Sequence, residues 1–463
     1  MQNLFTEVSS LDERCYREFS LTEDILMEHA ADGMADYIRH HYAQLTHICV
    51  VAGGGNNGAD GITLARLLHK DFKVSLYLAS TNPATMTQLQ LKRTEAIGVN
   101  IVEELPECDV LVDALFGSGL SRILDRKYQE LLNKMNTLTA EKIACDIPTG
   151  LSLAGQVQEV TFLADVTLTM GALKQGMFSD AAKEVVGEIH VVDLGVSRHI
   201  YESDSNWKLL ERSDLKLPYR HQKNSHKGSY GHSAIICGEK SGAAVLASSA
   251  ALRFGSGLVT LLSNDQEQIP YELMQSHLLP QTTTAIALGM GLGTEFSNEE
   301  LTTLLDNDLP LLLDADIFSH PLFTTLLKRE KLVLTPHPKE FTLILKACDL
   351  ASIDVETLQK DRFNYVERFC TAYPHITLLL KGANVIIAQD NHFYINPLGS
   401  NNLSKGGSGD VLAGLITALM AQGETTFTSA VQGSLAHTLA ANSVQKNSYA
   451  LSPNDLIEAV TTL

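Results

Sequence analysis

Residues 401–415 (NNLSKGGSGDVLAGL) place one aspartate directly before an apolar, helix-forming run. Glycines let a backbone turn and approach a ligand closely, and the free N–H groups at a helix start attract anions. A carboxylate would repel a bound phosphate, so Asp410 is better suited to take a proton from an attacking hydroxyl. The alternative is a glycine-rich turn in which Asp410 only caps the helix.

Polar or glycine residues also end several predicted strands in the second half. Lys381 could face the phosphates or base of a nucleotide, and His337 is held between two prolines. Open α/β sheets bind ligands at the carboxyl ends of their strands. The pattern therefore favours nucleotide-dependent phosphoryl transfer, although a lone histidine is more often structural. The stretches are LLLKGAN (378–384), ALGMGLG (287–293), LTPHPKE (334–340) and LLLDAD (311–316), the last with Asp314 and Asp316.

The first half has its own glycine-rich loop, GGGNNGADG (53–61), between a predicted strand and the predicted helix GITLARLLHK. This is the position of a phosphate loop in a Rossmann-type sheet, but the spacing is not GxGxxG. The alternative is a turn capped by Asn57 or Asp60. Asp113, Asp146 and the Thr149 hydroxyl end nearby strands, and such hard oxygens suit an alkali or alkaline-earth cation.

Apolar strands that alternate with helices predict an α/β fold with parallel sheets in both halves. A polar, irregular run from about residue 201 to 227 marks the expected boundary, which gives domains 1–212 and 220–463. The predicted strands are 47–53, 73–79, 109–114, 142–147, 164–170 and 188–194 in the first half, and HSAIICG, GLVTLLS, AIALGMG, LPLLLDAD, KLVLTP, ITLLLKG and NVIIAQD in the second.

The composition narrows the class of protein. The 463 residues carry a net charge of −19, which disfavours a general nucleic-acid or anionic-membrane binder. The seven scattered cysteines form no CxxC pair and indicate free thiols in a reducing compartment. The N-terminus shows no signal peptide, and no apolar run is long enough to span a membrane. We expect a soluble cytoplasmic protein.

Residues 227–463 resemble the ribokinase-like superfamily and, more closely, the ADP/ATP-dependent NAD(P)H-hydrate dehydratases. Met290 stands where the family usually has proline and Lys339 where it has glycine, and both are expected to flank the substrate pocket. The LDAD stretch continues as IFS instead of Ala-Leu-Asn. The matching stretches are KGSYGHSAIICG, GAAVLASSAALRFGSGLVTL, ALGMGLG, LDAD, LTPHPKEF, LLKGANVIIA and GGSGDVLAG.

This resemblance implies a catalytic base, Asp410, that helps the hydroxyl of the hydrated ring attack the terminal phosphate of ADP. It implies Mg²⁺ for the phosphates, and backbone N–H groups of the glycine loop that stabilise the developing charge. Substrate contacts fall to Ala243, Gly291, His337 and Asp410. The ADP site is assigned to Lys381, Gly382, Ala383, Asn384, Val385, Lys405, Gly406, Gly407, Ser408 and Gly409.

Residues 1–210 resemble the NAD(P)H-hydrate epimerase domain, which implies a Rossmann-like three-layer α/β/α fold. Asp146 and Lys174 are the candidates for acid–base catalysis, and a K⁺ would be held by Asn57, Asp113 and Thr149. Ala59 replaces a usual glycine and is tolerated only at negative φ, Thr149 replaces serine, and the usual Arg-Gly pair is missing from the loop after GSGL. The implied substrate contacts are Asn56, Asn57, Gly58, Ala59, Asp60, Gly117, Ser118, Gly119, Leu120, Ser121, Arg122, Ile123 and Asp146.

The prediction is a bifunctional repair enzyme for hydrated NADH and NADPH (NADHX and NADPHX). The first domain interconverts the R and S epimers, and the second, ribokinase-like domain dehydrates the S form while ADP becomes AMP and phosphate. A homo-oligomer is expected, with neither nucleic acid nor membrane as a partner. The alternative is a ribokinase-like vitamin or sugar kinase whose N-terminal domain binds a ligand without catalysis.

Overall fold

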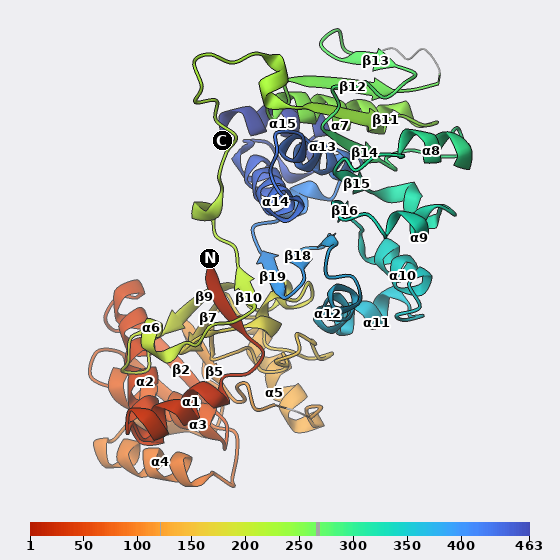
Figure 1. Ribbon diagram of the computed structural model, residues 1–463. Helices are drawn as coiled ribbons and strands as arrows, with labels where there is room; N and C mark the ends of the chain where they lie inside the picture. Colours follow the sequence, from red (N-terminus) through yellow and green to blue (C-terminus); the bar gives the residue numbers. More distant parts are fainter. Residues whose placement is uncertain (121, 265–268) are drawn as a thin grey trace. The chain divides into compact units, whose positions relative to one another are not determined.

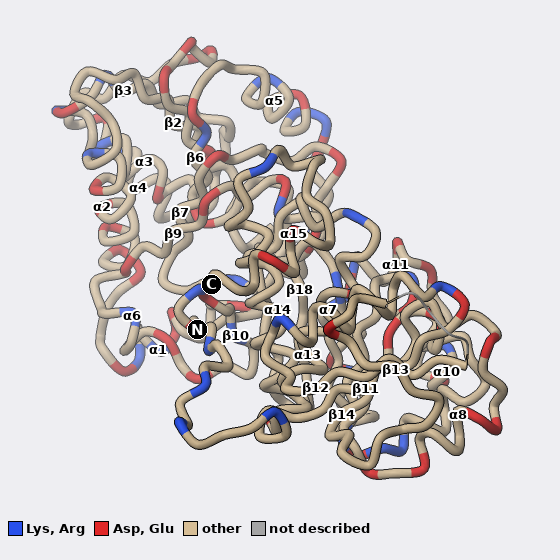
Figure 2. The backbone as a smooth tube through the Cα atoms, turned by 90° about the horizontal axis from the view of Figure 1, so that it is seen from above, with Lys and Arg blue, Asp and Glu red and all other residues tan. Residues whose placement is uncertain are grey.

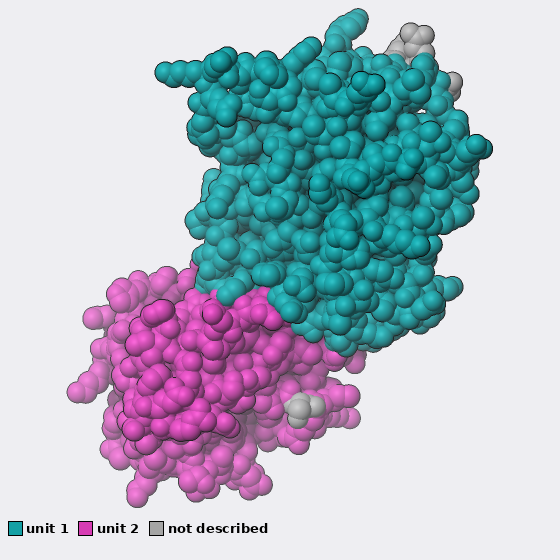
Figure 3. Space-filling view, viewed as in Figure 1, with its two compact units in different colours: residues 1–2, 208–463 teal, residues 3–207 magenta. Residues whose placement is uncertain are grey.

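A computed structural model describes residues 1–120, 122–264 and 269–463 of the chain. The chain divides into two compact units, Asn3–Trp207 and Lys208–Leu463, the second of which includes Met1–Gln2 (Figure 3). The proposed domain limits, 1–212 and 220–463, remain a prediction about which segments fold independently. Within the described ranges, no helix is long and apolar enough to cross a membrane. Acidic residues are spread over both units (Figure 2).

The sheet of the first unit consists of parallel strands in the order β4-β3-β2-β5-β6-β7-β9. A separate parallel pair joins Leu4 and Phe5 of β1 to Leu173 and Lys174 of β8. The strands are β1 (Gln2–Phe5), β2 (His47–Ala52), β3 (Lys73–Leu78), β4 (Asn100–Val102), β5 (Val110–Ala114), β6 (Glu141–Cys145), β7 (Val166–Met170), β8 (Leu173–Lys174) and β9 (Glu188–Val192). The helices are α1 (Ser9–Glu18), α2 (Glu23–His41), α3 (Asn56–Leu68), α4 (Thr85–Ile97), α5 (Arg126–Thr137) and α6 (Arg198–Tyr201).

Helices cover this sheet on both faces, because alternate side chains of a strand point to opposite sides. Ile48 and Val50 belong to a core shared with α2 and α3. Cys49 and Val51 belong to a second core that includes Leu132 of α5. Figure 1 shows α3 and α5 on opposite sides of β2 and β5. The predicted three-layer α/β/α arrangement is confirmed.

The sheet of the second unit runs β13-β12-β11-β14-β15-β16-β17-β18-β19. Strands from β13 to β17 pair in parallel, whereas β17, β18 and β19 pair as antiparallel hairpins. The strands are β11 (His232–Ile236), β12 (Leu258–Leu262), β13 (Met274–Ser276), β14 (Ala285–Leu288), β15 (Leu311–Leu313), β16 (Leu332–Leu334), β17 (Thr377–Leu380), β18 (Val385–Gln389) and β19 (His392–Asn396); β10 (Trp207–Leu209) spans the unit boundary.

Four helices form the large apolar core on one face of this second sheet: α7 (Ser241–Arg253), α13 (Ser408–Ala421), α14 (Thr426–Ser443) and α15 (Pro453–Ala459). Figure 1 shows α13 and α14 together on this face. Every residue of α13 from Val411 to Ala421 is buried. The start of α13 is therefore held rigidly. The remaining helices are α8 (Asn298–Leu304), α9 (Phe323–Leu326), α10 (Pro338–Ala347), α11 (Val355–Lys360) and α12 (Arg362–Ala372).

The α/β fold with two units is confirmed, and each predicted strand overlaps an observed one. The structure adds strands that the sequence analysis missed. Most of these are short, and a run of two to five residues shows too little alternation to be recognised. The added strands are β1, β4, β8, β10, β13 and β19.

Candidate functional sites

An ion pair lies at the carboxyl edge of the second sheet. Lys381 follows β17 and Asp314 follows β15, and both strands flank β16. Lys381 Nζ lies 2.8 Å from Asp314 Oδ1. Asp314 is only 2% exposed, so the pair is largely shielded from water on that side. Both residues follow the strands that were predicted before them.

The first turn of α13 packs against this ion pair. A Cβ placed on Gly409 would lie 3.5 Å from Lys381 Nζ and 3.8 Å from Asp314 Oδ2. Burial and the Asp314 carboxylate raise the pKa of Asp410 above its ordinary value, although Lys381 opposes them. A carboxylate with a raised pKa is a stronger proton acceptor once it is ionised. The arrangement can therefore supply a base beside a phosphate site.

The loop before α13 has the backbone expected of an anion site. Gly407 precedes the helix with φ of 89°, in the left-handed region. The first N–H groups of a helix have no partner within the helix, so they can bind an anion. Lys405 donates instead to the Tyr449 carbonyl, with Nζ 2.6 Å from the oxygen. Gly406 is exposed, whereas Ser408 is buried.

The turn from Lys381 to Asn384 joins β17 to β18. Gly382 and Ala383 are exposed there, whereas Asn384 and Val385 are 2% and 8% exposed. The Val385 side chain belongs to the apolar core of the second unit. Only the backbone of Val385 can therefore face a nucleotide, while the turn before it is open to one.

His337 is the N-cap of α10. Its Nδ1 accepts a hydrogen bond from the Glu340 N–H at 3.2 Å, and its own N–H donates to Glu340 Oε2 at 2.8 Å. Because Nδ1 accepts, the ring proton is assigned to Nε2, which lies 3.1 Å from Glu340 Oε1. Burial and then the Lys381 charge lower the pKa of His337. The structural role considered for this histidine is observed, and the substrate contact stays a prediction.

The glycines after β14 allow a close backbone approach. Gly291 has φ of 64°, and a Cβ there would lie 2.7 Å from the Lys240 carbonyl oxygen. This contact places Gly291 beside the start of α7, where Ala243 lies. Met290 is 0% exposed and its side chain belongs to the core, so its expected place beside the substrate pocket stays a prediction. Lys339 is exposed in the first turn of α10.

The first unit holds a buried ion pair of its own. Lys174 Nζ lies 2.5 Å from Asp146 Oδ1, and Lys174 is 0% exposed. The ammonium also donates to Thr169 Oγ1 at 2.8 Å and to the Met170 carbonyl at 2.9 Å. Burial raises the pKa of Asp146, but the charge and hydrogen bond of Lys174, together with the Ser118 and Met170 N–H groups, outweigh it and the pKa is lowered. Asp146 is thus an ionised carboxylate, held at a positive φ of 72°.

The glycine-rich loop of the first unit becomes helical earlier than predicted. Helix α3 begins at Asn56 and not at Gly61, so the substrate segment 56–60 is its first turn. Ala59 is fully buried in this turn and has no positive φ, which satisfies the condition for its replacement of glycine. Gly58 is required, because a Cβ there would lie 2.0 Å from the Gly53 carbonyl oxygen.

The pKa of Asp60 is raised, whereas the pKa of Asp146 is lowered. Burial, followed by the charges of Asp146 and Asp12, raises the pKa of Asp60 well above its ordinary value. Two nearby carboxyls whose environments separate their pKa values are typical of an acid–base pair, with one protonated and the other ionised. The raised pKa of Asp60 beside the ionised Asp146 is consistent with such a pair.

The candidate K⁺ ligands Asp113 and Thr149 meet in the structure. Asp113 is 0% exposed and accepts from the Thr149 hydroxyl and the Thr149 N–H, both at 2.8 Å. The Phe116 carbonyl lies 3.2 Å from the same hydroxyl. Burial, against these hydrogen bonds, raises the pKa of Asp113 to about 6. A buried carboxyl among hard oxygens fits K⁺, which would stabilise its ionised form.

Asn57 contacts the residue before Asp146 and the loop that begins at Gly117. With its amide oriented to suit its neighbours, it donates to the Cys145 carbonyl at 3.1 Å and accepts from the Gly117 N–H at 3.3 Å. The Ser118 N–H donates to Asp146 Oδ2 at 3.0 Å. The loop that begins at Gly117 therefore contacts both Asn57 and Asp146, through the N–H groups of Gly117 and Ser118.

The rest of this loop is less closely tied to the site. The Arg122 carbonyl accepts from Gln158 Nε2 at 3.0 Å, and Ile123 is 81% exposed. Gly119 has no atom near the position of a Cβ, and Leu120 is partly buried. The predicted contact Ser121 lies outside the described residues.

Two residues that the sequence analysis missed join this site. The Tyr201 hydroxyl donates to Asp12 Oδ1 at 2.8 Å, and Tyr201 is 1% exposed. Its ring packs on Gly171, where a Cβ would lie 2.5 Å from Tyr201 Cε1. Burial raises the pKa of Asp12, while Tyr201 and Lys174 oppose it. No motif marks them, and Tyr201 opens the polar run at the expected domain boundary.

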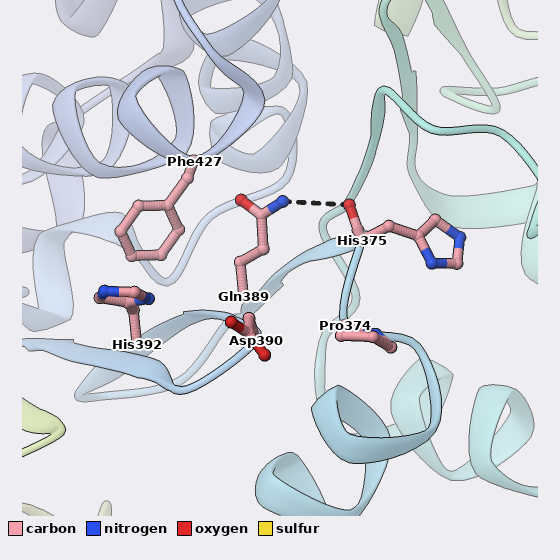
Figure 4. Close-up of a pocket in the computed structure, with 6 residues that line it drawn as sticks. All are labelled: Pro374, His375, Gln389, Asp390, His392 and Phe427. Carbon is pink, nitrogen blue, oxygen red and sulfur yellow. Dashed lines mark hydrogen bonds between the residues drawn. The ribbon is translucent and has the colours of Figure 1, made fainter.

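A pocket of about 480 Å³ in the second unit lies elsewhere (Figure 4). It is lined by residues from the start of β17, the β18–β19 turn and the start of α14, among them His392 and Phe427. These lie at the amino end of β17, whereas Lys381 lies at its carboxyl end. The pocket holds none of the predicted site residues and is not the candidate site.

The fold and the two ion pairs define a class of protein: a two-unit α/β protein with a candidate acid–base site in one unit and a candidate phosphoryl-transfer site in the other. Comparisons with known proteins agree with this class. The family described as NAD(P)H-hydrate dehydratase matches residues 233–462, and the family described as YjeF-related protein N-terminus matches residues 23–176.

Full-length relatives carry one description, bifunctional NAD(P)H-hydrate repair enzyme. The protein from Helicobacter pylori is 40% identical over 100% of both chains. The protein from Coxiella burnetii is 33% identical over 93% of this chain and 92% of its own. The chain therefore belongs to the bifunctional NAD(P)H-hydrate repair enzymes, and the predicted family is confirmed.

Solved structures resemble the second unit. A ribokinase-like superfamily protein from Enterococcus faecalis is 21% identical, with a TM-score of 0.48 over 56% of this chain and 96% of that one. An ADP/ATP-dependent NAD(P)H-hydrate dehydratase from Bacillus subtilis, co-crystallized with ATP/Mg²⁺, is 27% identical, with a TM-score of 0.46 over 54% of this chain and 94% of that one.

Proposed function

We propose that the chain repairs hydrated NADH and NADPH in two reactions, each in its own unit. The unit of residues 3–207 interconverts the R and S epimers. The unit of residues 208–463 dehydrates the S form while ADP becomes AMP and phosphate. The observation that carries the second assignment is the packing of the Asp410 turn against the Lys381–Asp314 ion pair.

In the dehydration, ionised Asp410 accepts the proton of the ring hydroxyl as the hydroxyl oxygen attacks the terminal phosphorus of ADP. The bond from that phosphorus to the bridging oxygen breaks, and AMP leaves with the electron pair. The electron pair of the ring nitrogen then expels the phosphate from the substrate carbon. The adjacent ring carbon then gives up a proton to water, and its C–H electron pair restores the dihydropyridine. Phosphate is a far better leaving group than hydroxide, so ADP drives the reaction.

The residues around Asp410 give this site its charges. Lys381 faces the position of the transferred phosphoryl group and is held by Asp314. The N–H groups of Gly406, Gly407 and Gly409 stabilise charge on the phosphate oxygens. Mg²⁺ neutralises nucleotide phosphates when it is bound. No group of three metal-binding side chains gathers in the described part of the chain, which suits an ion held mainly by phosphates and water.

In the epimerisation, the site acts at the carbon that bears both the hydroxyl and the ring nitrogen. Asp60, protonated because its pKa is raised, donates to the departing oxygen. Asp146, ionised beside Lys174, accepts a proton from the oxygen that returns on the other face. Asn57 and the Gly117 loop position the substrate. Asp113, Thr149 and Asn57 would hold K⁺, which would supply positive charge to this loop when bound.

A direct test is the nucleotide product formed with a hydrated NADH mixture, ADP, Mg²⁺ and K⁺. We expect one AMP for each NADH recovered. A kinase would instead convert ATP to ADP and leave a stable phosphorylated alcohol, with no NADH formed. That outcome would replace the repair function with the kinase alternative. The expected cytoplasmic location and homo-oligomeric state belong to the same proposal.

A further inference from the structure

A buried histidine contacts the first residue of the helix that carries Asp410. His437 lies in α14 and is 6% exposed. Its Nε2 lies 3.0 Å from the Ser408 carbonyl oxygen and 3.1 Å from Ser408 Oγ. Ser408 is itself 7% exposed and opens α13. The phosphoryl-transfer chemistry described above gives this histidine no part.

The direction of the contact follows from its chemistry. A carbonyl oxygen can only accept, so the Nε2 atom of His437 carries a proton and donates it. Burial lowers the pKa of His437 to about 4, so the ring is neutral near neutral pH. The donated hydrogen bond is therefore present throughout the working pH range and adds no net charge beside Lys381.

The Ser408 carbonyl and the Gly409 N–H belong to one peptide group. A hydrogen bond donated to a carbonyl polarises its amide and strengthens the N–H as a donor. The Gly409 N–H is one of the groups assigned to the phosphate, and Asp410 follows it directly. We propose that His437 is a positioning residue for phosphoryl transfer, which fixes the Ser408–Gly409 peptide and strengthens its donation to the phosphate. This inference rests on the proposed dehydration.

The test compares His437→Leu with His437→Gln, because glutamine can place an amide N–H near the position of Nε2. We expect His437→Leu to lower kcat for dehydration about 10- to 100-fold. This loss is no larger than the loss of a whole oxyanion donor, because the Gly409 N–H remains and is only weakened. His437→Gln should recover most of it. KM for the hydrate should stay unchanged, and epimerisation provides an internal control in the same chain.

A matched control separates catalysis from stability. His232 is another buried histidine, 3% exposed, which bonds Thr260 and Thr282 at the amino end of β11. His232→Leu should lower Tm without lowering kcat of the folded enzyme. If His437→Leu does not fold, His437→Asn, whose amide is too short to reach Ser408, takes its place.

Titration of ADP into each variant gives a readout that does not depend on turnover. Weaker ADP binding in His437→Leu than in His437→Gln supports the inference. Equal kcat in wild type and His437→Leu overturns it, as does equal impairment of the Leu and Gln variants. Failure of the wild type to dehydrate the hydrate would refute the proposed function, and the ADP titration would still decide the role of His437.

Discussion

Replacement of Asp410 by asparagine separates the two proposed reactions in one chain. Asparagine keeps the size and the hydrogen-bonding capacity of the side chain, but it cannot accept the proton of the ring hydroxyl. Asp410 lies in the second unit, against the Lys381–Asp314 pair. Asp410→Asn should therefore abolish ADP-dependent dehydration and leave epimerisation unchanged.

The expected loss follows from the role of Asp410. A positioned general base contributes about 10²- to 10⁴-fold, so kcat should fall within that range. In the wild type, kcat should also fall as the pH drops through the raised pKa of Asp410. Since that pKa is raised in the folded state, ionised Asp410 opposes folding, and this effect grows as the pH rises. Asp410→Asn should therefore not lower Tm.

The assay follows NADH formation from the S hydrate with ADP, while chromatography of the two epimers follows epimerisation. Asp390→Asn is a matched control, because Asp390 lies in the β18–β19 turn at the other end of the sheet, with φ of 52° that asparagine tolerates. The control should keep both activities. A loss of dehydration smaller than about tenfold in Asp410→Asn would refute the assignment of the base.

Three further predictions concern the first unit. Lys174→Met leaves Asp146 buried and unpaired, so it should abolish epimerisation and cost about 3–5 kcal/mol in denaturant unfolding. Asp146→Asn leaves the Lys174 ammonium buried without its counter-charge, so it should lose the activity at a similar cost. Without K⁺, the free energy of unfolding should fall as the pH rises through about 6, because the pKa of Asp113 is raised to about 6 in the folded state. K⁺ should therefore raise Tm more above pH 6 than below it. Tetramethylammonium at equal ionic strength is the control. An equal increase in Tm above and below pH 6 would contradict the assignment of Asp113 as a K⁺ ligand. Ala59→Gly should cost about 0.5–1 kcal/mol without improving epimerisation, because Ala59 lies inside a helix; a gain in stability would show that glycine is preferred there.

The strand ends were predictable because they follow from local pattern. An apolar run that stops at a charged residue, as at Lys381, Asp113 or Asp146, indicates both a strand and its carboxyl end. Parallel strands bring those ends to one edge, so the sequence could assign Lys381 and Asp410 to one candidate site. The start of α3 was predicted late, because asparagine and glycine favour turns as strongly as helix starts.

Side chains that depend on distant partners could not be predicted. Asp12 and Tyr201 are far apart in the sequence and meet only through the fold. His337 caps α10 through Glu340, three residues away, a local pattern that the sequence holds and that fits the structural role considered for this histidine. Met290 follows a strand like the site residues, yet its side chain turns into the core. Pattern gives the position of a residue along an element, and packing decides where its side chain points.

In the proposed function, two sites in one chain act on two epimers of the same substrate. The most direct measurement follows a mixture of R and S hydrates incubated with the Asp146→Asn variant, excess ADP, Mg²⁺ and K⁺. Chromatography resolves the two epimers, and the incubation is kept much shorter than the time of spontaneous epimerisation. We predict that the S form disappears with stoichiometric AMP and NADH while the R form remains, whereas the wild type consumes both. Consumption of both forms at the wild-type rate, or survival of the S form, would contradict the claim.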